Sequence, residues 1–502
     1  MYFLSPSYLR LNIDRKELIF ISLLLLASLT MMQVFYPFTC LIGFLCLAMS
    51  FVVFLKPLIG IYIFILLYPL ASVTFTLSHP RAPAFVCFEE IFTLLLFFVM
   101  ILRQLSDHHQ QPIHNKDYRK YTYKWYIFLL TLFFIWSIFT LIKPLYFPFA
   151  LFGWWRFISS FVIMTYLLIY MDSYKKFIGV LIFYCFVSFI YALSAVYATN
   201  YAFLKNYELF HILNSFVSIR VALYNDASGI LLQNVGLLTG VGFAPKHEAA
   251  LLLSSGIFFA VFLMKLYKSL KIRLVMVVLI LLFIIIIYQV FSRISIAGML
   301  IVPVFLCLAI PSWRKSIVGV FVILIVLNLA GLFGSSLIRT AHMKNMESDI
   351  QKIEVVASKS KYKASSLPGR IDIWQRSIER IVESKGMGSG PDSLWNDLAF
   401  SLPHAHNFVL TIAADYGLPG VVLILIFLII LGNSSYKSIL GGGTVNNHLW
   451  LLQVLCVSTS LHALFVYCFD MPIGRKHLWF MLGLLMASIN LADKEAIKIS
   501  RR

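Results

Sequence analysis

The stretch HNFVLTIAADYGLPGVVLILIFLIILG, residues 406–432, decides the fold, because a polar boundary opens directly into a long apolar run. A helix needs about 17–25 apolar residues to cross the hydrocarbon core of a bilayer. Pro403 disfavours a helix through its predecessor, Asn407 suits an N-cap, and Gly432 suits a helix end. The stretch therefore predicts a membrane-spanning helix over residues 406–431 that begins at a water-facing loop.

Apolar runs of this length recur along most of the 502-residue chain. Hydrophobic residues make up 60% of the chain, charged residues make up only 13%, and the mean hydropathy is +0.87. This composition is typical of a polytopic membrane protein. Because backbone in lipid must satisfy its own hydrogen bonds, we expect an all-α fold, a single polytopic domain over residues 1–502 with about 14 transmembrane helices (roughly 12–14). The expected spans are residues 17–35, 37–55, 58–77, 84–102, 125–144, 157–171, 177–198, 247–264, 274–291, 295–310, 316–337, 406–431, 448–469 and 478–492.

Lysine and arginine are unevenly divided between the two sides of these spans. The side that holds both termini carries 22 of the 41 basic residues, the short segments of the opposite side carry nine, and ten lie in the loop 339–405. Short basic loops stay in the cytoplasm, so we expect both termini there and residues 339–405 to form one large, partly helical extracytoplasmic loop. The net charge of +19 is scattered over short loops, which argues against nucleic acid as a partner.

The nine basic residues on the short outer segments run against this charge rule and invite a functional explanation. Arginine binds phosphate through two parallel hydrogen bonds, so guanidinium groups at the outer membrane boundary suit an anionic lipid head group. For any one of these residues, the alternative is snorkelling to membrane phosphates. The nine residues are Arg81, Lys143, Arg156, Lys205, Arg220, Lys246, Arg293, Arg475 and Lys476.

The long loop contains an expected amphipathic helix at residues 368–382, which lies on the membrane or caps the bundle. Apolar residues at three- or four-residue spacing are expected to form its buried face, namely Ile371, Trp374, Ile378 and Ile381. The segment Gly386-Met-Gly-Ser-Gly-Pro391 follows this helix. We interpret it as a flexible turn with backbone amides available to an anion.

His404 and His406 lie where the long loop meets the span that follows it. A helix N-terminus presents amides and positive potential, so it attracts phosphate and disfavours a protonated imidazole. A neutral histidine at this point can act as a general base. The alternative is an interfacial histidine that only hydrogen-bonds the loop.

Three blocks of the sequence, in this order and on the expected side, resemble the O-antigen ligase and polysaccharide polymerase superfamily. The first block, Phe291-Ser-Arg-Ile-Ser-Ile-Ala-Gly298, is similar to the Ser-Arg turn of the family. The second block, Gly369-Arg370 with Trp374 and Gly386-x-Gly388, is similar to its outer loop. The third block, His406-Asn-Phe-Val-Leu410 with Asp415-Tyr-Gly-Leu-Pro-Gly420, is similar to its histidine motif. Together with an upstream block, the resemblance covers residues 231–425.

The upstream block, Thr239-Gly-Val-Gly-Phe-Ala-Pro245, departs from the family pattern, because Thr239 stands where an arginine is usual. Lys246 and Arg220 are both candidates to replace that charge.

The resemblance implies glycosyl transfer on the outer face from an undecaprenyl-diphosphate-linked glycan, with no nucleotide sugar, metal or other cofactor. A diphosphate is a good leaving group, so the reaction needs positive charge and a base more than a strong acid. We expect His406 to be the general base, with Arg293 and Arg370 as the diphosphate clamps. The remaining substrate-binding candidates are Arg220, Lys246, Arg376, Arg380 and His404.

We expect a polymerase of the bacterial inner membrane that joins lipid-linked repeats of an O-antigen, capsule or exopolysaccharide. Its partners are then the lipid-linked donor, a glycan or lipid-core acceptor, membrane lipids and a chain-length regulator. An O-antigen ligase that transfers to lipid A–core, or a protein O-oligosaccharyltransferase, would use the same donor chemistry. A lipid-linked oligosaccharide flippase is the competitor from another class. It predicts charges along a central path, whereas transfer predicts that Arg293, Arg370 and His406 surround one outward-facing cavity.

Ionisable side chains also fall within the expected spans, where they are expensive unless they face the bundle interior. Glu89 and Glu90 are expected to face that interior and to line an acceptor or lipid path. For His462 we expect an interior hydrogen bond. Asp415 lies nine residues along its helix from His406, and we expect it to fix local structure and not to titrate in the mechanism.

Overall fold

The computed structural model describes a subset of the chain. The described residues are 49–68, 74–77, 84–110, 122–142, 144, 147–200, 246–290, 294–299, 302, 322, 367–391, 393, 405–442, 447–470 and 476–500.

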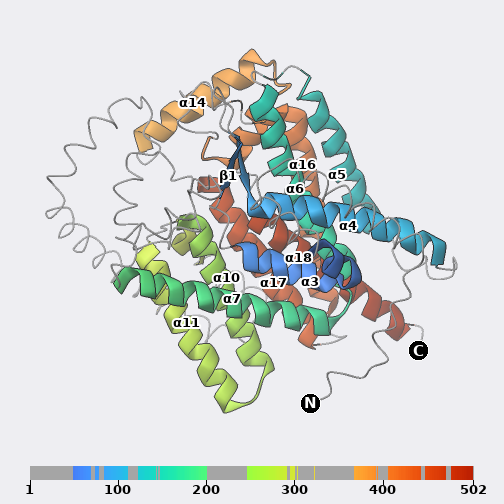
Figure 1. Ribbon diagram of the computed structural model, residues 1–502, viewed down its shortest axis with the longest axis vertical. Helices are drawn as coiled ribbons and strands as arrows, with labels where there is room; N and C mark the ends of the chain where they lie inside the picture. Colours follow the sequence, from blue (N-terminus) through green and yellow to red (C-terminus); the bar gives the residue numbers. More distant parts are fainter. Residues whose placement is uncertain are drawn as a thin grey trace, which may run out of the picture.

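The described part is a bundle of helices with one short hairpin of strands (Figure 1). Its main helices are α3 (Pro57–Leu67), α4 (Phe88–Gln110), α5 (Thr122–Phe139), α6 (Phe147–Tyr170), α7 (Tyr174–Asn200), α10 (Lys246–Leu266), α11 (Leu270–Val290), α14 (Leu367–Glu383), α16 (Phe408–Gly442), α17 (Asn447–Asp470) and α18 (Lys476–Ser500). Within the described part of the chain, five helices are long and apolar enough to cross a bilayer, namely Tyr174–Leu193, Glu248–Leu266, Leu270–Ile287, Phe408–Leu440 and His448–Phe469. These helices confirm a helical membrane protein, whereas the number of 14 spans stays a prediction.

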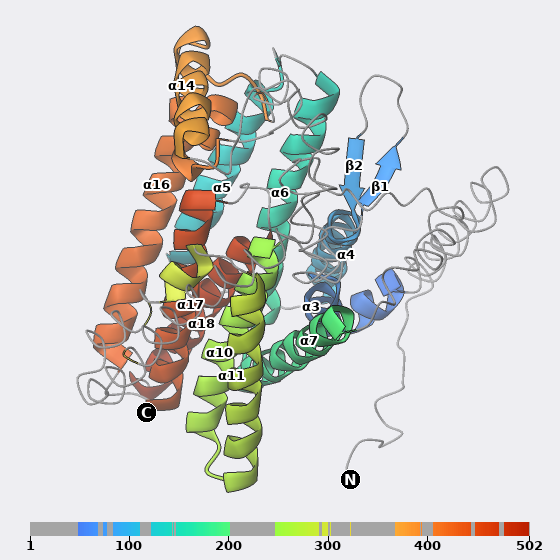
Figure 2. The ribbon, with the colours of Figure 1, turned by 90° about the vertical axis from the view of Figure 1, so that its left-hand side faces the viewer.

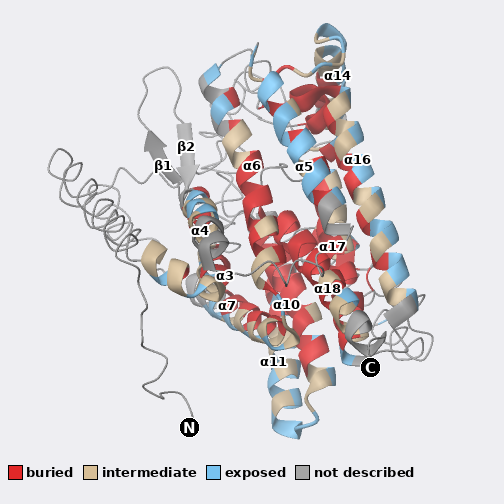
Figure 3. Ribbon diagram, turned by 90° about the vertical axis from the view of Figure 1, so that its right-hand side faces the viewer, coloured by how far each residue is buried: buried red, intermediate tan, exposed pale blue. Residues whose placement is uncertain are grey.

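The core lies where α6, α10, α17 and α18 pack together, and their facing surfaces are buried (Figure 3). Helix α11 differs, because it exposes large apolar side chains at helical spacing. They are Leu270, Leu274, Val278, Leu281 and Ile285. Such a stripe is unfavourable in water and suits contact with lipid, so the outward face of α11 is consistent with a membrane span.

The all-α fold is confirmed for the described residues apart from one short hairpin, which corrects the boundaries of two expected spans. Strands β1 (Thr74–Leu77) and β2 (Ala84–Cys87) pair antiparallel, with Thr74 opposite Cys87. Neither strand belongs to a helix, although we expected helical spans over 58–77 and 84–102. The reason lies in the residue types, because β1 (Thr-Phe-Thr-Leu) and the centre of β2 (Phe85-Val86) consist largely of β-branched and aromatic residues, which favour extended backbone.

Helix α16 continues well past Gly432, which we expected to end it. A glycine inside a helix costs only about 1 kcal/mol, and packing on a neighbouring helix offsets that amount. Here α17 supplies the packing. Its Gln453 donates from Nε2 to Ser438 Oγ at 2.6 Å, and its Trp450 donates from Nε1 to Ile439 O at 3.0 Å.

The two ends of the bundle carry different elements (Figure 2). Helix α14 lies at one end, beside the start of α16, whereas the turn between α10 and α11 and the last residues of α18 lie at the other. The described residues of the outer loop that are expected to carry chemistry lie on or beside α14, at one end of the bundle.

Candidate active site

Helix α14 packs on the beginning of α16 through a small apolar cluster. Ile373 on α14 is fully buried against Ala405 and Ala414, and Trp374 packs against the same cluster. This contact joins the outer-loop helix to the turn that precedes α16, so it determines where His406 lies.

The buried face of α14 is not the one we expected. Ile371 and Ile378 are 50% and 51% exposed, whereas Ile373 and Ser377 are fully buried and Ile381 is partly buried. The hydroxyl of Ser377 donates to Ile373 O at 2.7 Å, so a polar residue is tolerated on this face. Trp374 and Ile381 belong both to the face that we expected to be buried and to the face that is buried. The spacing of apolar residues alone therefore does not identify the buried face of α14.

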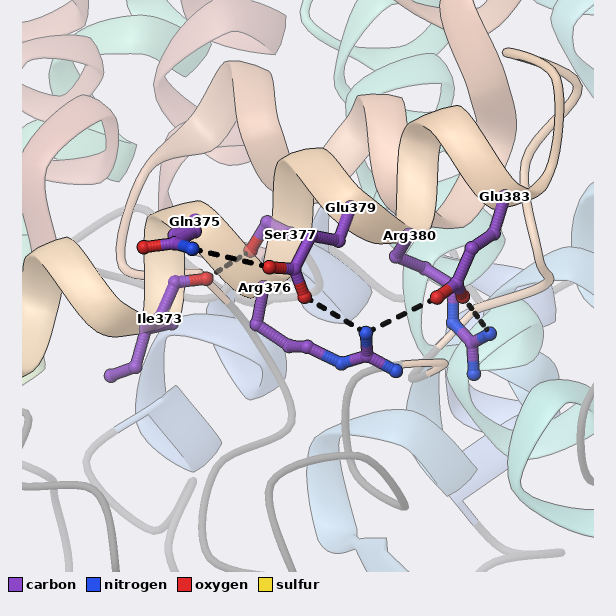
Figure 4. A network of polar contacts seen from close by, with 7 residues as sticks. All are labelled: Ile373, Gln375, Arg376, Ser377, Glu379, Arg380 and Glu383. Atoms are coloured by element: carbon purple, nitrogen blue, oxygen red, sulfur yellow. Dashed lines mark hydrogen bonds and ion pairs between the residues drawn. The ribbon is translucent and has the colours of Figure 1, made fainter.

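Arg376 and Arg380 form ion pairs along the outer surface of α14 (Figure 4). Arg376 Nη1 lies 3.0 Å from Glu379 Oε2 and 3.2 Å from Glu383 Oε1, and Arg380 Nη1 lies 2.7 Å from Glu383 Oε2. The hydrogen bond from Arg376 holds the pKa of Glu379 below its usual value. Neighbouring carboxylates therefore compensate both arginines, which makes them poorer diphosphate clamps than their position in the loop indicated.

The turn after α14 closes the helix with a Schellman motif. Gly386 N donates to Ile381 O at 2.8 Å, and Lys385 N donates to Val382 O at 2.9 Å. The residue in the left-handed position of this motif is Lys385, with φ +53°, where glycine is usual. This arrangement directs residues 386–390 back toward α16.

A break in α16 receives that turn. Gly417 has φ +74° and ψ 176°, and Pro419 has no N–H to donate to Asp415 O. The carbonyls released by the break find other donors: Ser389 N donates to Ala414 O at 2.9 Å and Gly390 N donates to Asp415 O at 3.0 Å. The break is therefore satisfied by hydrogen bonds from the turn.

Further bonds complete the joint between the turn and α16. Leu418 N donates to Gly386 O at 2.8 Å, and Trp136 Nε1 on α5 donates to Tyr416 O at 2.6 Å. Asp415 Oδ1 accepts from Ser393 Oγ at 3.0 Å, which agrees with the structural role expected for this carboxylate. The kink in α16 is thus fixed from both α5 and the outer loop.

Close approach of two backbones explains the glycines at this joint. A Cβ on Gly388, whose φ is +88°, would lie 2.6 Å from Asp415 O and 2.6 Å from Gly417 N. These contacts correct our interpretation of residues 386–391 as a flexible turn with amides available to an anion. The amides of Gly386, Ser389 and Gly390 already donate to backbone carbonyls, so the segment serves as a joint.

His406 lies directly before α16, in a backbone conformation held by its neighbours. Its φ is +50°, and its side chain is half-buried. Asn407 is the N-cap, as expected, because its Oδ1 accepts from Leu410 N at 3.1 Å. A non-glycine residue at positive φ costs about 1–3 kcal/mol and persists only where its surroundings impose it.

Both backbone groups of Ala405, the buried residue before His406, are bound by side chains from two helices. Trp374 Nε1 on α14 donates to Ala405 O at 2.9 Å. Ala405 N donates to Thr411 Oγ1 on α16 at 3.1 Å. These bonds hold the chain entering His406 from two directions, so they account for its unusual φ.

Arg370 lies one helical turn before Trp374 on α14, the helix that packs on the beginning of α16. Its side chain is half-buried, and its Nη1 donates to Phe469 O near the end of α17 at 3.4 Å. Helix α14 thus packs on the start of α16 and, through Arg370, contacts the end of α17.

The other candidates are placed less fully. Arg220, Arg293 and His404 lie outside the described residues, and of Lys246, the first residue of α10, only the backbone is described. The cavity between Arg293, Arg370 and His406 therefore stays a prediction. Among the described residues, no group of three or more His, Cys, Asp and Glu is placed to hold a metal ion.

A second charged cluster contains Glu90, Arg156 and Lys476, which the sequence alone did not connect. Glu90 on α4 is buried, and its Oε1 accepts from Arg156 Nε on α6 at 3.0 Å and lies 3.8 Å from Lys476 Nζ on α18. The interior position expected for Glu90 is confirmed. Pairing offsets the cost of burying these charges, so two of the nine outer basic residues have a partner inside the bundle.

Comparison with known proteins bears on this region. Residues 277–425 match the family model described as O-antigen ligase, and no curated protein matches the chain. The matched range contains α14, the turn at 386–390, His406 and the kink of α16; residues 231–276, which we also expected to belong, lie outside it. The match over residues 277–425 supports the placement of this chain in the O-antigen ligase and polymerase superfamily.

Proposed function

We propose that this protein is a glycan polymerase of the bacterial inner membrane, which transfers a glycan from an undecaprenyl-diphosphate donor to a sugar hydroxyl on the outer face. The observation that carries the proposal is the agreement between the family match and the geometry. Within the matched residues, Trp374, one helical turn after Arg370, donates a hydrogen bond to the carbonyl of Ala405, the residue before His406. A cation for the donor and a base for the acceptor are thus supplied by elements packed on one another.

The proposed reaction is a single displacement. The acceptor hydroxyl oxygen attacks the anomeric carbon, the bond from that carbon to the diphosphate oxygen breaks, and His406 accepts the hydroxyl proton. The lipid diphosphate leaves with the bonding electrons, and Arg370 and Arg293 bind its negative charge. No metal takes part, because the arginines neutralise the leaving group.

The kink in α16 supports a position for this site at the membrane surface. The 19 residues from Leu418 to Tyr436 form about 28 Å of helix, which matches a hydrocarbon core of about 30 Å. Apolar side chains on this part, such as Val422 and Ile429, are exposed. Residues 408–417 and α14 then lie just outside the hydrocarbon, within reach of a lipid-linked diphosphate.

The proposed topology has 14 spans, with both termini in the cytoplasm. In that topology, the turn between α10 and α11 is cytoplasmic. Lys268 lies in this turn, Lys265 in the last turn of α10 and Lys271 in the first turn of α11. Basic residues favour the cytoplasmic side, so this end of the bundle fits the proposal. The opposite end, with α14, faces outward.

Ligase activity is the second candidate, because the matching family model is itself described as O-antigen ligase. A ligase would use the same donor and the same base, with lipid A–core as the acceptor, and a protein O-oligosaccharyltransferase would use a hydroxyl on a protein. We favour the polymerase because the expected number of spans exceeds that typical of ligases in this superfamily. Membrane lipids and a chain-length regulator are its proposed partners.

The test is surface-glycan analysis in a deletion strain complemented with variants. We expect His406→Ala to give lipopolysaccharide capped with a single repeat while the protein still inserts into the membrane. His448→Ala is the matched control, because His448 is exposed at the start of α17 and far from the proposed site. Uncapped core with accumulated lipid-linked polymer would instead identify a ligase, and a normal chain-length distribution would overturn the role of His406.

A further inference from the structure

We infer that the turn between α10 and α11 binds the head group of an anionic phospholipid, whose acyl chains lie along the exposed face of α11. The inference goes beyond the proposed function and does not depend on it, because it concerns the end of the bundle opposite α14 (Figure 2). Three features of this pair of helices carry it: exposed basic residues, an exposed apolar face, and the position of the first relative to the second.

Basic residues gather at the turn, and all of them are exposed. They are Lys265 in the last turn of α10, Lys268 in the connection, and Lys271 and Arg273 at the start of α11. The one acidic residue in the sequence of the two helices is Glu248, which lies in the first turn of α10, about 25 Å from Lys265 along the helix. The turn therefore carries positive charge that no acidic residue of α10 or α11 neutralises.

The basic residue Lys176 at the start of α7 has a different environment. Lys176 Nζ lies 2.8 Å from Asp172 Oδ1, so a neighbouring carboxylate compensates this cation. Arg273 instead donates from Nε to Tyr267 O at 3.2 Å, which ties the guanidinium to the turn. This bond uses Nε and neither of the two Nη groups, which can bind phosphate oxygens through parallel hydrogen bonds. Arg273 is thus held in place while its outer edge suits an anion.

Helix α11 is the least buried of the five apolar spans. Of its span, 17% is buried inside the protein, compared with 72% of the span in α10. The apolar stripe that begins with Leu270, Leu274, Val278 and Leu281 has side chains that are 54–70% exposed. From Leu270 to Leu281 this stripe is about 16 Å long, which matches one leaflet of a hydrocarbon core about 30 Å thick. An acyl chain of a phospholipid therefore fits along it.

Two of the basic residues flank the stripe where it meets the turn. Lys271 precedes Val275 and Val278 by four and seven residues, so it lies at one edge of the stripe. Arg273 precedes Val277 and Leu281 by four and eight residues, so it lies at the other edge. A lipid whose chains follow the stripe thus has its phosphate between an ammonium and a guanidinium group.

A second copy of this chain is the alternative occupant of the stripe. Two copies in one membrane have the same orientation, so a symmetric contact between their α11 helices brings the basic residues of both turns to the same level. Like charges at that level repel one another, whereas a phosphate has the opposite charge. Charge complementarity therefore favours a lipid. A zwitterionic phospholipid has the same acyl chains without a net charge, so a preference for anionic lipid is the property to measure.

The measurement is native mass spectrometry of purified full-length protein, titrated with phosphatidylglycerol or with phosphatidylcholine of the same acyl chains. We expect wild type to bind phosphatidylglycerol at least about tenfold more tightly, because each basic residue near an anionic head group strengthens binding about fivefold. The variant Lys268→Gln/Lys271→Gln/Arg273→Gln should lose this preference. Lys176→Gln is the matched control, because it removes a cation that Asp172 already compensates, and it should keep the preference.

A second variant and a salt titration keep the test decisive if the triple variant fails to fold. Arg273→Gln alone should lower the preference about fivefold. In wild type, about 1 M salt should remove most of it, because the Debye length then falls to about 3 Å. Equal binding of the two lipids by wild type would show ordinary contact of basic side chains with membrane phosphates and would overturn the inference. A preference that survives the charge substitutions would overturn it as well.

Two further results would identify another occupant and so refute the lipid site. Inorganic phosphate has no acyl chains and should not displace bound phosphatidylglycerol, so displacement would reveal a site for a soluble anion. Val278→Asn should weaken the binding of both lipids alike, since it changes the stripe and leaves the charges in place. A two-copy species that Val278→Asn separates and phosphatidylglycerol does not would show that the stripe is an interface between copies. All of these results are independent of glycan transfer, so they leave the proposed function untouched.

Discussion

Gly388→Ala should detach the 386–390 turn from α16, and the structure gives the size of the effect. The new Cβ would lie 2.6 Å from Asp415 O, 2.6 Å from Gly417 N and 2.7 Å from Tyr416 C. All three are backbone atoms, so no side chain can rotate away to make room. An L-residue at φ +88° also costs about 1–2 kcal/mol.

Relief of the clash requires that the turn move away from the kink. The hydrogen bonds from Ser389 N to Ala414 O and from Gly390 N to Asp415 O are then lost. Each contributes about 1 kcal/mol net, and the kink carbonyls lose their replacement donors. With the backbone cost, we expect a loss of about 3–4 kcal/mol in the free energy of unfolding.

Two other glycines provide matched controls. Gly386 has φ +74° but meets only the flexible side chain of Leu418, at 3.1 Å, so Gly386→Ala should cost about 1–2 kcal/mol. Gly432 has no atom within 4 Å of a new Cβ and lies inside α16, so Gly432→Ala should stabilise the protein by about 1 kcal/mol.

The assay is the thermal denaturation of detergent-purified protein, followed by surface-glycan analysis of the same variants. We expect the melting temperature to fall in the order Gly432→Ala, wild type, Gly386→Ala, Gly388→Ala, and glycan extension to be lost in the last. Wild-type melting and normal glycan in Gly388→Ala would refute the proposed backbone joint.

Three further predictions concern α14 and its contacts. Trp374→Phe removes the indole N–H that donates to the buried carbonyl of Ala405, the residue before His406. An unsatisfied buried carbonyl costs about 1–3 kcal/mol, so the rate of glycan transfer by purified protein should fall about tenfold. An unchanged rate would show that this bond does not hold the proposed base in place. Lys385→Gly relieves a positive φ and should raise the unfolding free energy by about 0.5–1 kcal/mol, and a lower melting temperature would contradict the Schellman assignment. The pKa of Glu379 is lowered by Arg376, so its stabilising effect is complete above the unfolded-state pKa of about 4.3 and disappears as pH falls through the lower folded-state pKa. The melting temperature of Glu379→Gln should therefore lie below that of wild type in an assay near neutral pH and equal that of wild type in acid. An equal difference in melting temperature under both conditions would exclude the ion pair as its cause.

Local signals in the sequence predicted the elements of the site better than their contacts. The helix expected over 368–382 is α14, and Asn407 is the N-cap of α16, because helical periodicity and capping depend on residues a few positions apart. The prediction of the packed face of α14 was wrong, because that face is determined by contacts with Ala405 and Ala414, which lie far along the chain. Periodicity alone does not reveal which of two overlapping apolar stripes meets a partner.

The joint between the turn and α16 was missed for a different reason, although a signal was present. Pro419 leaves a carbonyl without its helical donor, and Gly417 interrupts the same helix. The loop glycines at 386, 388 and 390 permit a close backbone approach. The helix has a carbonyl without a donor, and the glycine-rich segment supplies amide N–H groups. The two segments are therefore complementary, but this becomes evident only when both are considered together.

The residues that follow each arginine of α14 in the sequence distinguish the candidate diphosphate clamps. Arg376 and Arg380 each have a glutamate three positions later, and both pairs are formed in the structure. This spacing is visible in the sequence, and such pairs favour the helix more than they favour an external anion. Arg370 has Ile373 and Trp374 at the corresponding positions, so its own helix supplies no glutamate of this kind. Its guanidinium instead donates to Phe469 O at the end of α17, and we propose it as the arginine of this helix best placed to meet a diphosphate.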